Sequence, residues 1–283
     1  MAKLLKGAPV AAALTGELIP RAEALKRSGI TPCLAILRVG ERTDDLAYER
    51  GALKRCESVG IAVRRFVLPG TATQSCLMDT VEEINQDDSI HGCLLFRPLP
   101  KMLDEESACA ALAPRKDADG ITPASMAGIY SGFGIGYAPC TAQACMELLR
   151  YYGIEAAGKR AAVIGRSLVI GRPVAQLLMA ADATVTVCHT KTRNLPELVR
   201  EADLVVAATG RAEAIGPECF REGQVVLDVG INWSEARQKL VGDVDFESVE
   251  PLVAAISPVP NGVGSVTAAV LCKHVIESAE RLR

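Results

Sequence analysis

The chain has 283 residues, of which 49% are hydrophobic and 4% aromatic, and its formal net charge is −3. This composition excludes intrinsic disorder and gives enough length for two packed domains. The 31 basic residues are scattered along the chain, which predicts no nucleic-acid partner, and no run reaches the roughly 18 apolar residues of a membrane span. We therefore expect a cytoplasmic protein that acts on a small molecule.

The first half of the chain alternates β-like apolar runs with helical periods. An amphipathic helix opens it, and charged residues such as Glu17 and Arg21 interrupt its apolar positions. Because the following strands are apolar nearly throughout, they are typical of a parallel sheet that is covered on both faces. The predicted strands are 33–39, 62–68 and 91–96, and the predicted helices are 44–59, closed by Gly60, and 76–85.

The second half repeats this alternation after a Gly-rich, aperiodic segment at 120–140. We predict two doubly wound α/β domains, 1–138 and 139–265, with the C-terminal helix 266–283 docking back onto the first. The predicted elements are helices at 141–152, 172–180, 195–202 and 265–281, and strands at 160–164, 184–188, 204–207, 224–229 and 254–256.

The cysteines and histidines predict neither disulfides nor a metal site. The ten cysteines stand singly inside apolar runs, without a C-x-x-C pair, as small buried hydrophobes do in a reducing compartment. The three histidines, His91, His189 and His274, are far apart in the sequence, which argues against a zinc site.

The segment RAAVIGRSLVIGRPVAQLL places a strand before a short glycine-bounded loop and a helix. Gly165 and Gly171 allow a ligand to approach the backbone closely, and Pro173 lies near the start of the helix. A helix start of this kind favours a pyrophosphate. The spacing is G-x-x-x-x-x-G rather than G-x-G-x-x-G, so a purely structural tight turn is the alternative.

The end of the second strand of this domain distinguishes NADP from NAD. NAD-binding folds place an acidic residue there, about 20 residues after the glycine loop, to bind the ribose 2′-hydroxyl. Here the sequence is CHTKT, so Thr190 and Lys191, together with Arg166 in the loop, offer donors and positive charge to a 2′-phosphate. This pattern favours NADP and leaves NAD possible; a polar surface loop is the alternative.

Two further loops carry candidate ligand residues. KDADG at 116–120 places two carboxylates beside a glycine, although turn chemistry alone often explains such a pattern. SPVPNGVGSVT at 257–267 combines stiff prolines with permissive glycines directly after a predicted strand, which suits a loop over a ligand.

Six motifs that follow one another along the chain resemble the methylenetetrahydrofolate dehydrogenase/cyclohydrolase family: KDADG, VIGRSLVIGRPVAQLL, ATVTVCHTKT, VVLDVGIN, LVGDVDF and PVPNGVG. The resemblance implies a folate domain, a Rossmann-type NAD(P) domain, an active-site cleft between them and a homodimer. It also implies hydride transfer from 5,10-methylenetetrahydrofolate to NADP, followed in bifunctional members by hydrolysis of the methenyl product.

The resemblance assigns ligand contacts to further residues of the chain. Asp119 matches an aspartate that contacts the pterin. Asn261 and Ser265 stand where glycine and proline are usual, and CTAQA at 140–144 departs from the usual C-T-P-x-G. Tyr48 and Asp119 are the expected catalytic residues. Expected substrate contacts are Tyr48, Asp119, Pro258, Pro260, Gly262 and Gly264, and expected cofactor contacts are Gly165, Arg166, Ser167, Gly171, Pro173, Thr190 and Ile231.

The hydrolytic pair of the family is absent from this sequence. Members of the family usually show Tyr-x-x-x-Lys, with the tyrosine against the folate and the lysine as polar catalyst, helped by a glutamine in V-Q-L-P-L-P. Here Tyr48 matches the tyrosine, Ala52 stands at the lysine position and Phe96 at the glutamine position. Lys54 lies about 120° from the Tyr48 position around the helix and is interpreted as solvated.

We therefore expect a dehydrogenase with weak or absent cyclohydrolase activity, since general acid/base help worth about 10² to 10⁴ in rate is missing. Two alternatives stay open: a bifunctional enzyme in which Arg97 or Lys54 replaces the lysine, and a pseudoenzyme that senses folate or NADP. The sequence fixes neither the direction of the reaction in the cell nor the preference for polyglutamate chains.

Overall fold

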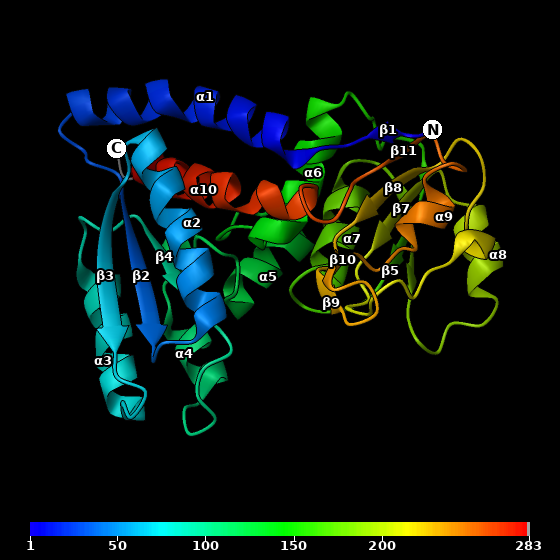
Figure 1. Cartoon of the computed structure of the whole chain (residues 1–283). Coiled ribbons are helices and arrows are strands. Elements are labelled where there is room, and N and C mark those ends of the chain that lie inside the picture. The colour runs from blue at the N-terminus through cyan, green and yellow to red at the C-terminus, as the bar shows by residue number, and fades with distance from the viewer. Residues whose placement is uncertain (282–283) are drawn as a thin grey trace. The chain divides into compact units, whose positions relative to one another are not determined.

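The computed structural model describes residues 1–281, which fold into two compact units (Figure 1). The N-terminal unit comprises residues 13–140 and the C-terminal segment from 268 on, and the C-terminal unit comprises residues 1–12 and 141–267. The first twelve residues, which the sequence places in an undivided N-terminal domain, thus group with the C-terminal unit. Within residues 1–281, no helix has the length and apolar character needed to cross a membrane.

The N-terminal unit is built on a three-stranded parallel sheet in the order β3-β2-β4. Its strands are β2 (Cys33–Val39), β3 (Ala62–Leu68) and β4 (Gly92–Leu95), within the ranges predicted from the sequence. Every residue of the central strand β2 is buried, as expected for a strand covered on both faces.

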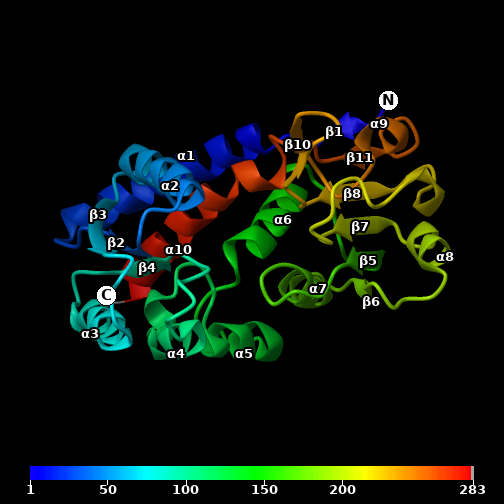
Figure 2. The same cartoon turned by 60° about the horizontal axis from the view of Figure 1, so that its bottom comes forward.

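Alternate residues of β2 contribute to two different cores. The face with Ala35 and Leu37 packs against α3 (Gln74–Gln86) and α4 (Glu105–Ala111). The opposite face carries Arg38, which pairs with Glu49 of α2 (Thr43–Val59). Figures 1 and 2 show α2 on the side of this sheet opposite to α3. This alternation decides which side chains at the strand ends can meet α2.

The C-terminal unit has a six-stranded sheet in the order β1-β11-β8-β7-β5-β6, with every strand pair parallel. The chain passes from β5 outward to β6 and then returns across β5 to β7. The strand order therefore reverses between β5 and β7, as in doubly wound, Rossmann-type folds. The strands are β1 (Lys3–Leu4), β5 (Arg160–Ile164), β6 (Thr184–Cys188), β7 (Leu204–Ala207), β8 (Val225–Asp228) and β11 (Ala255–Ile256).

Helices cover both faces of this sheet. Helix α7 packs on β5 and β6, and Val199 of α8 lies in the core on the other face. Figure 2 shows α7 and α8 at different sides of the strands. The remaining helices are α1 (Gly7–Arg27), α5 (Pro123–Ser131), α6 (Cys140–Tyr151), α7 (Gly171–Ala180), α8 (Leu195–Arg200), α9 (Phe246–Val249) and α10 (Thr267–Arg281).

The structure corrects the sequence-based prediction at several short elements. The segment 120–140 is not aperiodic throughout, because it contains α5, whose N-terminus is capped by the Thr122 side chain and which ends at Gly132 with φ of 73°. The sequence analysis also missed β1 and the antiparallel hairpin of β9 (Asn232–Ser234) and β10 (Lys239–Val241). Two or three residues are too few to show a period.

Candidate functional site

In the N-terminal unit, the structure brings Tyr48 and Phe96 together. Tyr48 lies on α2, Phe96 directly follows β4, and their ring centroids are 5.9 Å apart with the planes at 82°, an edge-to-face contact. Ala52, one turn after Tyr48, is 1% exposed, and Phe96 is 7% exposed. The positions that carry lysine and glutamine in the family resemblance are therefore covered apolar positions beside the tyrosine.

The two cationic side chains proposed as replacements for the lysine are directed elsewhere. Lys54 is exposed on another side of α2, as the helical period predicts. Arg97 is half-buried, and its guanidinium lies 3.8 Å from Glu105 of α4, on the α4 side of the sheet. Phe96 and Arg97 follow the last residue of β4, and their side chains meet different partners, Tyr48 and Glu105.

Asp119 lies in a tightly held loop of the N-terminal unit. The preceding Asp117 carboxylate accepts hydrogen bonds from the backbone N–H of Ile121 at 2.9 Å and of Thr122 at 2.7 Å. A Cβ at Gly120 would lie 2.4 Å from the backbone of Ala138, so this position requires glycine. The loop thereby fixes the direction of the Asp119 carboxylate.

Burial raises the pKa of Asp119 to about 6, although hydrogen bonds from Cys140 favour the carboxylate. The charge of Asp117 raises this pKa further and that of Arg97 lowers it. His274 approaches the same loop, where its Nδ1 lies 2.8 Å from the carbonyl oxygen of Ala118. At neutral pH the carboxylate form dominates and can accept hydrogen bonds from a ligand.

The charge of Asp119 leads to a pH-dependence prediction. As the pH falls through about 6, Asp119 gains a proton, so the affinity for folate should weaken and KM should rise toward that of Asp119→Asn. The measurement is KM for methylenetetrahydrofolate from pH 5 to 8 in both proteins, with an expected rise of about tenfold in the unaltered protein. If KM of Asp119→Asn rose with falling pH in the same way as KM of the unaltered protein, the assignment to Asp119 would be contradicted.

Helix α2 also carries buried charges that the sequence analysis did not single out. The Glu49 carboxylate is 2% exposed and pairs with the guanidinium of Arg38 at 3.0 Å and with that of Arg65 at 2.6 Å. Arg42, before the helix, donates to the carbonyl oxygen of Pro98 at 3.0 Å. These pairs fix α2 against β2, β3 and the loop that follows Phe96. In the sequence, the signal is charged residues on the apolar face of the helix.

In the C-terminal unit, the glycine loop lies where the strand order reverses. Gly165 follows β5 with φ of 131°, and a Cβ there would lie 2.1 Å from the carbonyl oxygen of Ala208, which follows β7. A Cβ at Gly171 would lie 2.2 Å from the carbonyl oxygen of Gly165. Both glycines are thus required by close backbone approach at the crevice where doubly wound folds bind nucleotides.

The start of α7 is capped by Ser167 in this structure. The Ser167 hydroxyl accepts a hydrogen bond from the N–H of Ile170 at 3.1 Å. The backbone carbonyl oxygen of Ser167 accepts one from the N–H of Arg172 at 3.0 Å. Pro173 has no N–H to offer. A pyrophosphate at this helix start would share these donors with Ser167, while the exposed side chain of Arg166 supplies positive charge beside it.

The loop after β6 fits the 2′-phosphate of NADP. Thr190 and Lys191 are exposed there, and the turn is fixed by hydrogen bonds from the His189 N–H to the Thr192 hydroxyl at 2.9 Å and from the Lys191 N–H to His189 Nδ1 at 3.1 Å. The residues of the turn include a cation and hydroxyl donors and no acid, which favours a phosphate over a bare ribose hydroxyl.

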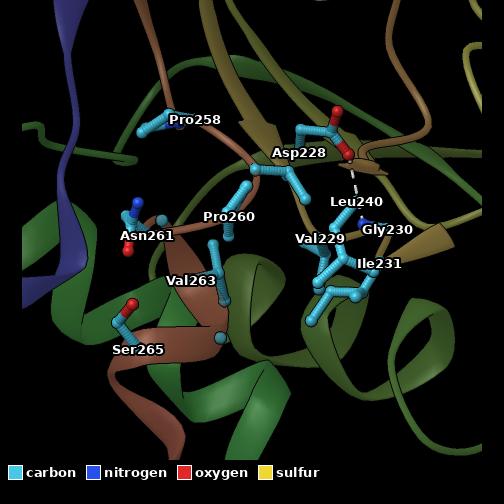
Figure 3. Close-up of a pocket in the computed structure, with 13 residues that line it drawn as sticks. Asp228, Val229, Gly230, Ile231, Leu240, Pro258, Pro260, Asn261, Val263 and Ser265 are labelled. Atoms are coloured by element: carbon cyan, nitrogen blue, oxygen red, sulfur yellow. Dashed lines mark hydrogen bonds between the residues drawn. The ribbon is translucent and has the colours of Figure 1, made fainter. Parts of the chain in front are cut away.

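A pocket of about 170 Å³ in the C-terminal unit brings together most of the remaining candidates (Figure 3). Ile231, the expected cofactor contact, lies within it, and a Cβ at Gly264 would lie 3.2 Å from its Cδ1. Asp228 and Leu240 also line this pocket and were not predicted. The predicted folate contacts that line it are Pro258, Pro260, Gly262 and Gly264.

The loop that carries these prolines and glycines is held by the first residues of the chain. The Gly7 N–H donates to the carbonyl oxygen of Asn261 at 2.8 Å, and a Cβ at Gly7 would lie 2.1 Å from the carbonyl oxygen of Gly262. Asn261 has φ of 81°, a conformation that glycine adopts readily and asparagine tolerates. This backbone explains why asparagine can replace glycine here.

Asp228 is a buried carboxylate behind the same pocket. It accepts from the N–H groups of Gly230 at 3.1 Å, Asp243 at 3.0 Å and Val244 at 3.0 Å. Figure 3 shows the bond to Gly230, which fixes the turn that leads to Ile231. Burial raises the pKa of Asp228 to about 7, while these three donors favour the charged form.

Comparison with known proteins identifies the family. Residues 5–119 match the model of the tetrahydrofolate dehydrogenase/cyclohydrolase catalytic domain, and residues 139–283 match that of the NAD(P)-binding domain. The chain belongs to the tetrahydrofolate dehydrogenase/cyclohydrolase family. Its two-unit α/β fold and its NAD(P) domain follow from this membership.

Relatives and solved structures of this family agree along the whole chain. The bifunctional protein FolD of Carboxydothermus hydrogenoformans is 48% identical over 100% of this chain and 99% of its own length. The crystal structure of the bifunctional FolD of Campylobacter jejuni has a TM-score of 0.96 at 38% identity and covers 100% of both chains. FolD of Trypanosoma brucei, solved with NADP and an inhibitor, has a TM-score of 0.91 at 35% identity. This match covers 99% of the present chain and 98% of the Trypanosoma brucei chain.

Proposed function

We propose that this protein is an NADP-dependent 5,10-methylenetetrahydrofolate dehydrogenase of one-carbon metabolism with weak or absent cyclohydrolase activity. The observation that carries this proposal is the covered apolar contact at the tyrosine of α2. Ala52 and Phe96, at 1% and 7% exposure, provide neither an amine nor an amide to orient water. Hydrolysis needs such proton transfer, whereas hydride transfer needs mainly a fixed geometry.

Each group of site residues has a different proposed role. Tyr48 and Asp119 bind and orient the folate, and Ala52 and Phe96 exclude water from the one-carbon unit. The bound NADP supplies the hydride acceptor. Gly165, Ser167 and Lys191 hold the phosphates, and Ile231 lies in the pocket formed with the 258–265 loop.

Two further parts of the proposal concern the setting of the enzyme. We expect a homodimer in the cytoplasm, on the family resemblance and on the reduced state of the ten cysteines, nine of which are buried. Size measurement in solution tests the dimer. A fully bifunctional enzyme is the second candidate, because the relative from Carboxydothermus hydrogenoformans carries that name.

A paired assay tests the proposed activities. The purified protein, given NADP and methylenetetrahydrofolate, should form NADPH, followed by its fluorescence, and methenyltetrahydrofolate should accumulate in nearly equal amount. Hydrolysis of added methenyltetrahydrofolate should match the rate without enzyme to within about twofold, since acid/base help is missing. Accelerated decay of the added compound would support the bifunctional alternative instead.

A further inference from the structure

One largely buried aspartate on helix α2 has no role in the mechanism described above. Asp45 is 6% exposed and belongs to the buried stripe of this helix with Glu49 and Ala52. Its neighbour Asp44 is exposed. Both acids lie in the first turn of α2, where the helix dipole favours negative charge, so the dipole explains an acid at either position but not the burial of Asp45.

The fold does not pair this carboxylate. No hydrogen bond or ion pair joins the Asp45 side chain to another residue in the described range 1–281, whereas Glu49, one turn later, pairs with Arg38 at 3.0 Å and Arg65 at 2.6 Å. The Asp45 oxygens are not among the fully buried unpaired atoms of the described residues, so the carboxylate keeps access to solvent and to a bound ligand. Burial raises the pKa of Asp45, and the nearby guanidinium groups of Arg42 and Arg38 lower it and so favour its charged form.

The helical geometry places Asp45 beside the candidate folate site. Residues three and seven positions apart share one side of a helix, so Asp45, Tyr48 and Ala52 lie along one side of α2. Helical side chains lean toward the N-terminus. A lysine at position 52 would therefore reach back over Tyr48, toward the turn from which Asp45 projects.

Arg42 connects Asp45 to the other wall of this site. Its guanidinium acts on the pKa of Asp45 and donates to the carbonyl oxygen of Pro98 at 3.0 Å, two residues after Phe96. Phe96 in turn packs edge-to-face on Tyr48. Asp45 therefore stands where α2 and the loop after β4 converge.

We propose that Asp45 is a catalytic carboxylate that contacts the one-carbon bridge of the bound folate and stabilises the positive charge formed there during hydride transfer. This inference rests on the proposed dehydrogenase function. The C–H bond of the methylene bridge breaks, its electron pair leaves as hydride to the oxidised nicotinamide, and the two nitrogens flanking the carbon share the positive charge. No proton is gained or lost in this step.

The negative charge of Asp45 and the absence of the lysine at position 52 would both favour a positive charge on the bound folate. An ammonium group at position 52 would oppose a developing cation, whereas Ala52 is neutral and Asp45 is negative. A fixed charge placed where charge develops lowers the barrier because it needs no reorganisation. The pair of residues thus favours hydride transfer over attack by water.

The test compares Asp45→Asn with Asp44→Asn, which removes the same charge from the same helical turn at an exposed position. We expect kcat for NADPH formation to fall about 10- to 100-fold in Asp45→Asn and to stay within about twofold in Asp44→Asn. KM should change little, and the deuterium isotope effect with deuterated methylene substrate should rise because chemistry becomes slower. Tm should stay equal or increase, since partial burial disfavours the charged form of Asp45 in the folded protein.

Asp45→Ser provides a smaller neutral variant, and the same fall in kcat is expected if the asparagine protein folds poorly. An unchanged kcat in both Asp45 variants, or a loss confined to KM together with a lower Tm, would overturn the inference alone. Enzymatic hydrolysis of methenyltetrahydrofolate that disappears in Asp45→Asn would overturn it in favour of a general base. Absence of NADPH formation by the unaltered protein would overturn the proposed function itself.

Discussion

Replacing Ala52 by lysine and Phe96 by glutamine together should raise the hydrolysis of methenyltetrahydrofolate by about 10²- to 10⁴-fold, the usual worth of general acid/base help. Each single change should give little. A lysine at position 52, which is 1% exposed, would face an aromatic ring without a hydrogen-bond partner, and burial would lower its pKa. Glutamine at position 96 supplies the partner and removes the ring that packs on Tyr48.

The measurement is the decay of added methenyltetrahydrofolate, corrected for the rate without enzyme. Lys54→Ala serves as the matched control, because this lysine lies on the same helix and is exposed, so its removal should leave both activities unchanged. A full gain from Ala52→Lys alone would show that the lysine needs no partner. Equal hydrolysis by the unaltered protein would show that another group already performs the step.

Replacing Gly165 by alanine should weaken NADP binding by at least about 100-fold, because a displacement of about 1 Å in a positioning loop has effects of this size. The added Cβ would lie 2.1 Å from the carbonyl oxygen of Ala208, which forces β5 and β7 apart at the crevice between their ends. Residue 165 also has φ of 131°, which residues with a Cβ rarely adopt.

Gly158→Ala is the control variant, because it introduces backbone strain at a positive φ without a steric clash of the new Cβ. Gly158 also has a positive φ, 73°, yet a Cβ there would meet no atom within 4 Å. The control variant should lose some stability, about 1 kcal/mol, and keep its NADP affinity. Titration of NADPH fluorescence gives the affinity, and thermal unfolding gives the stability. Equal affinity in the two variants would contradict the role given to the Gly165 loop.

Much of the fold could be predicted because the pattern of apolar residues is a local property. Strands β2, β3 and β6 have the predicted bounds. An apolar run between turn signals is enough to define such a strand, because the pattern does not depend on the neighbouring strands. The prediction failed where tertiary context makes the element. Strand β1 is two residues long and exists because it pairs with β11, more than 250 residues later.

The candidate site divides in the same way. Motifs were enough to propose Tyr48, Asp119 and the glycines at 165 and 171 as candidates, because each motif is contiguous in the sequence. Asp228, Leu240 and the burial of Asp45 could not be found, since each depends on which segments pack against it.

The sequence by itself determined that α2 carries Tyr48 and Ala52 on one face and Lys54 on another, because the helical period of about 100° per residue needs no knowledge of the fold. The tertiary structure decided what that face meets. After the end of β4, Phe96 contacts Tyr48 and Arg97 pairs with Glu105. Strands β2 and β3 supply the guanidinium groups that pair with Glu49, and no residue among 1–281 pairs with Asp45. Side-chain direction within an element is local, whereas the groups it meets come from segments that packing alone brings together.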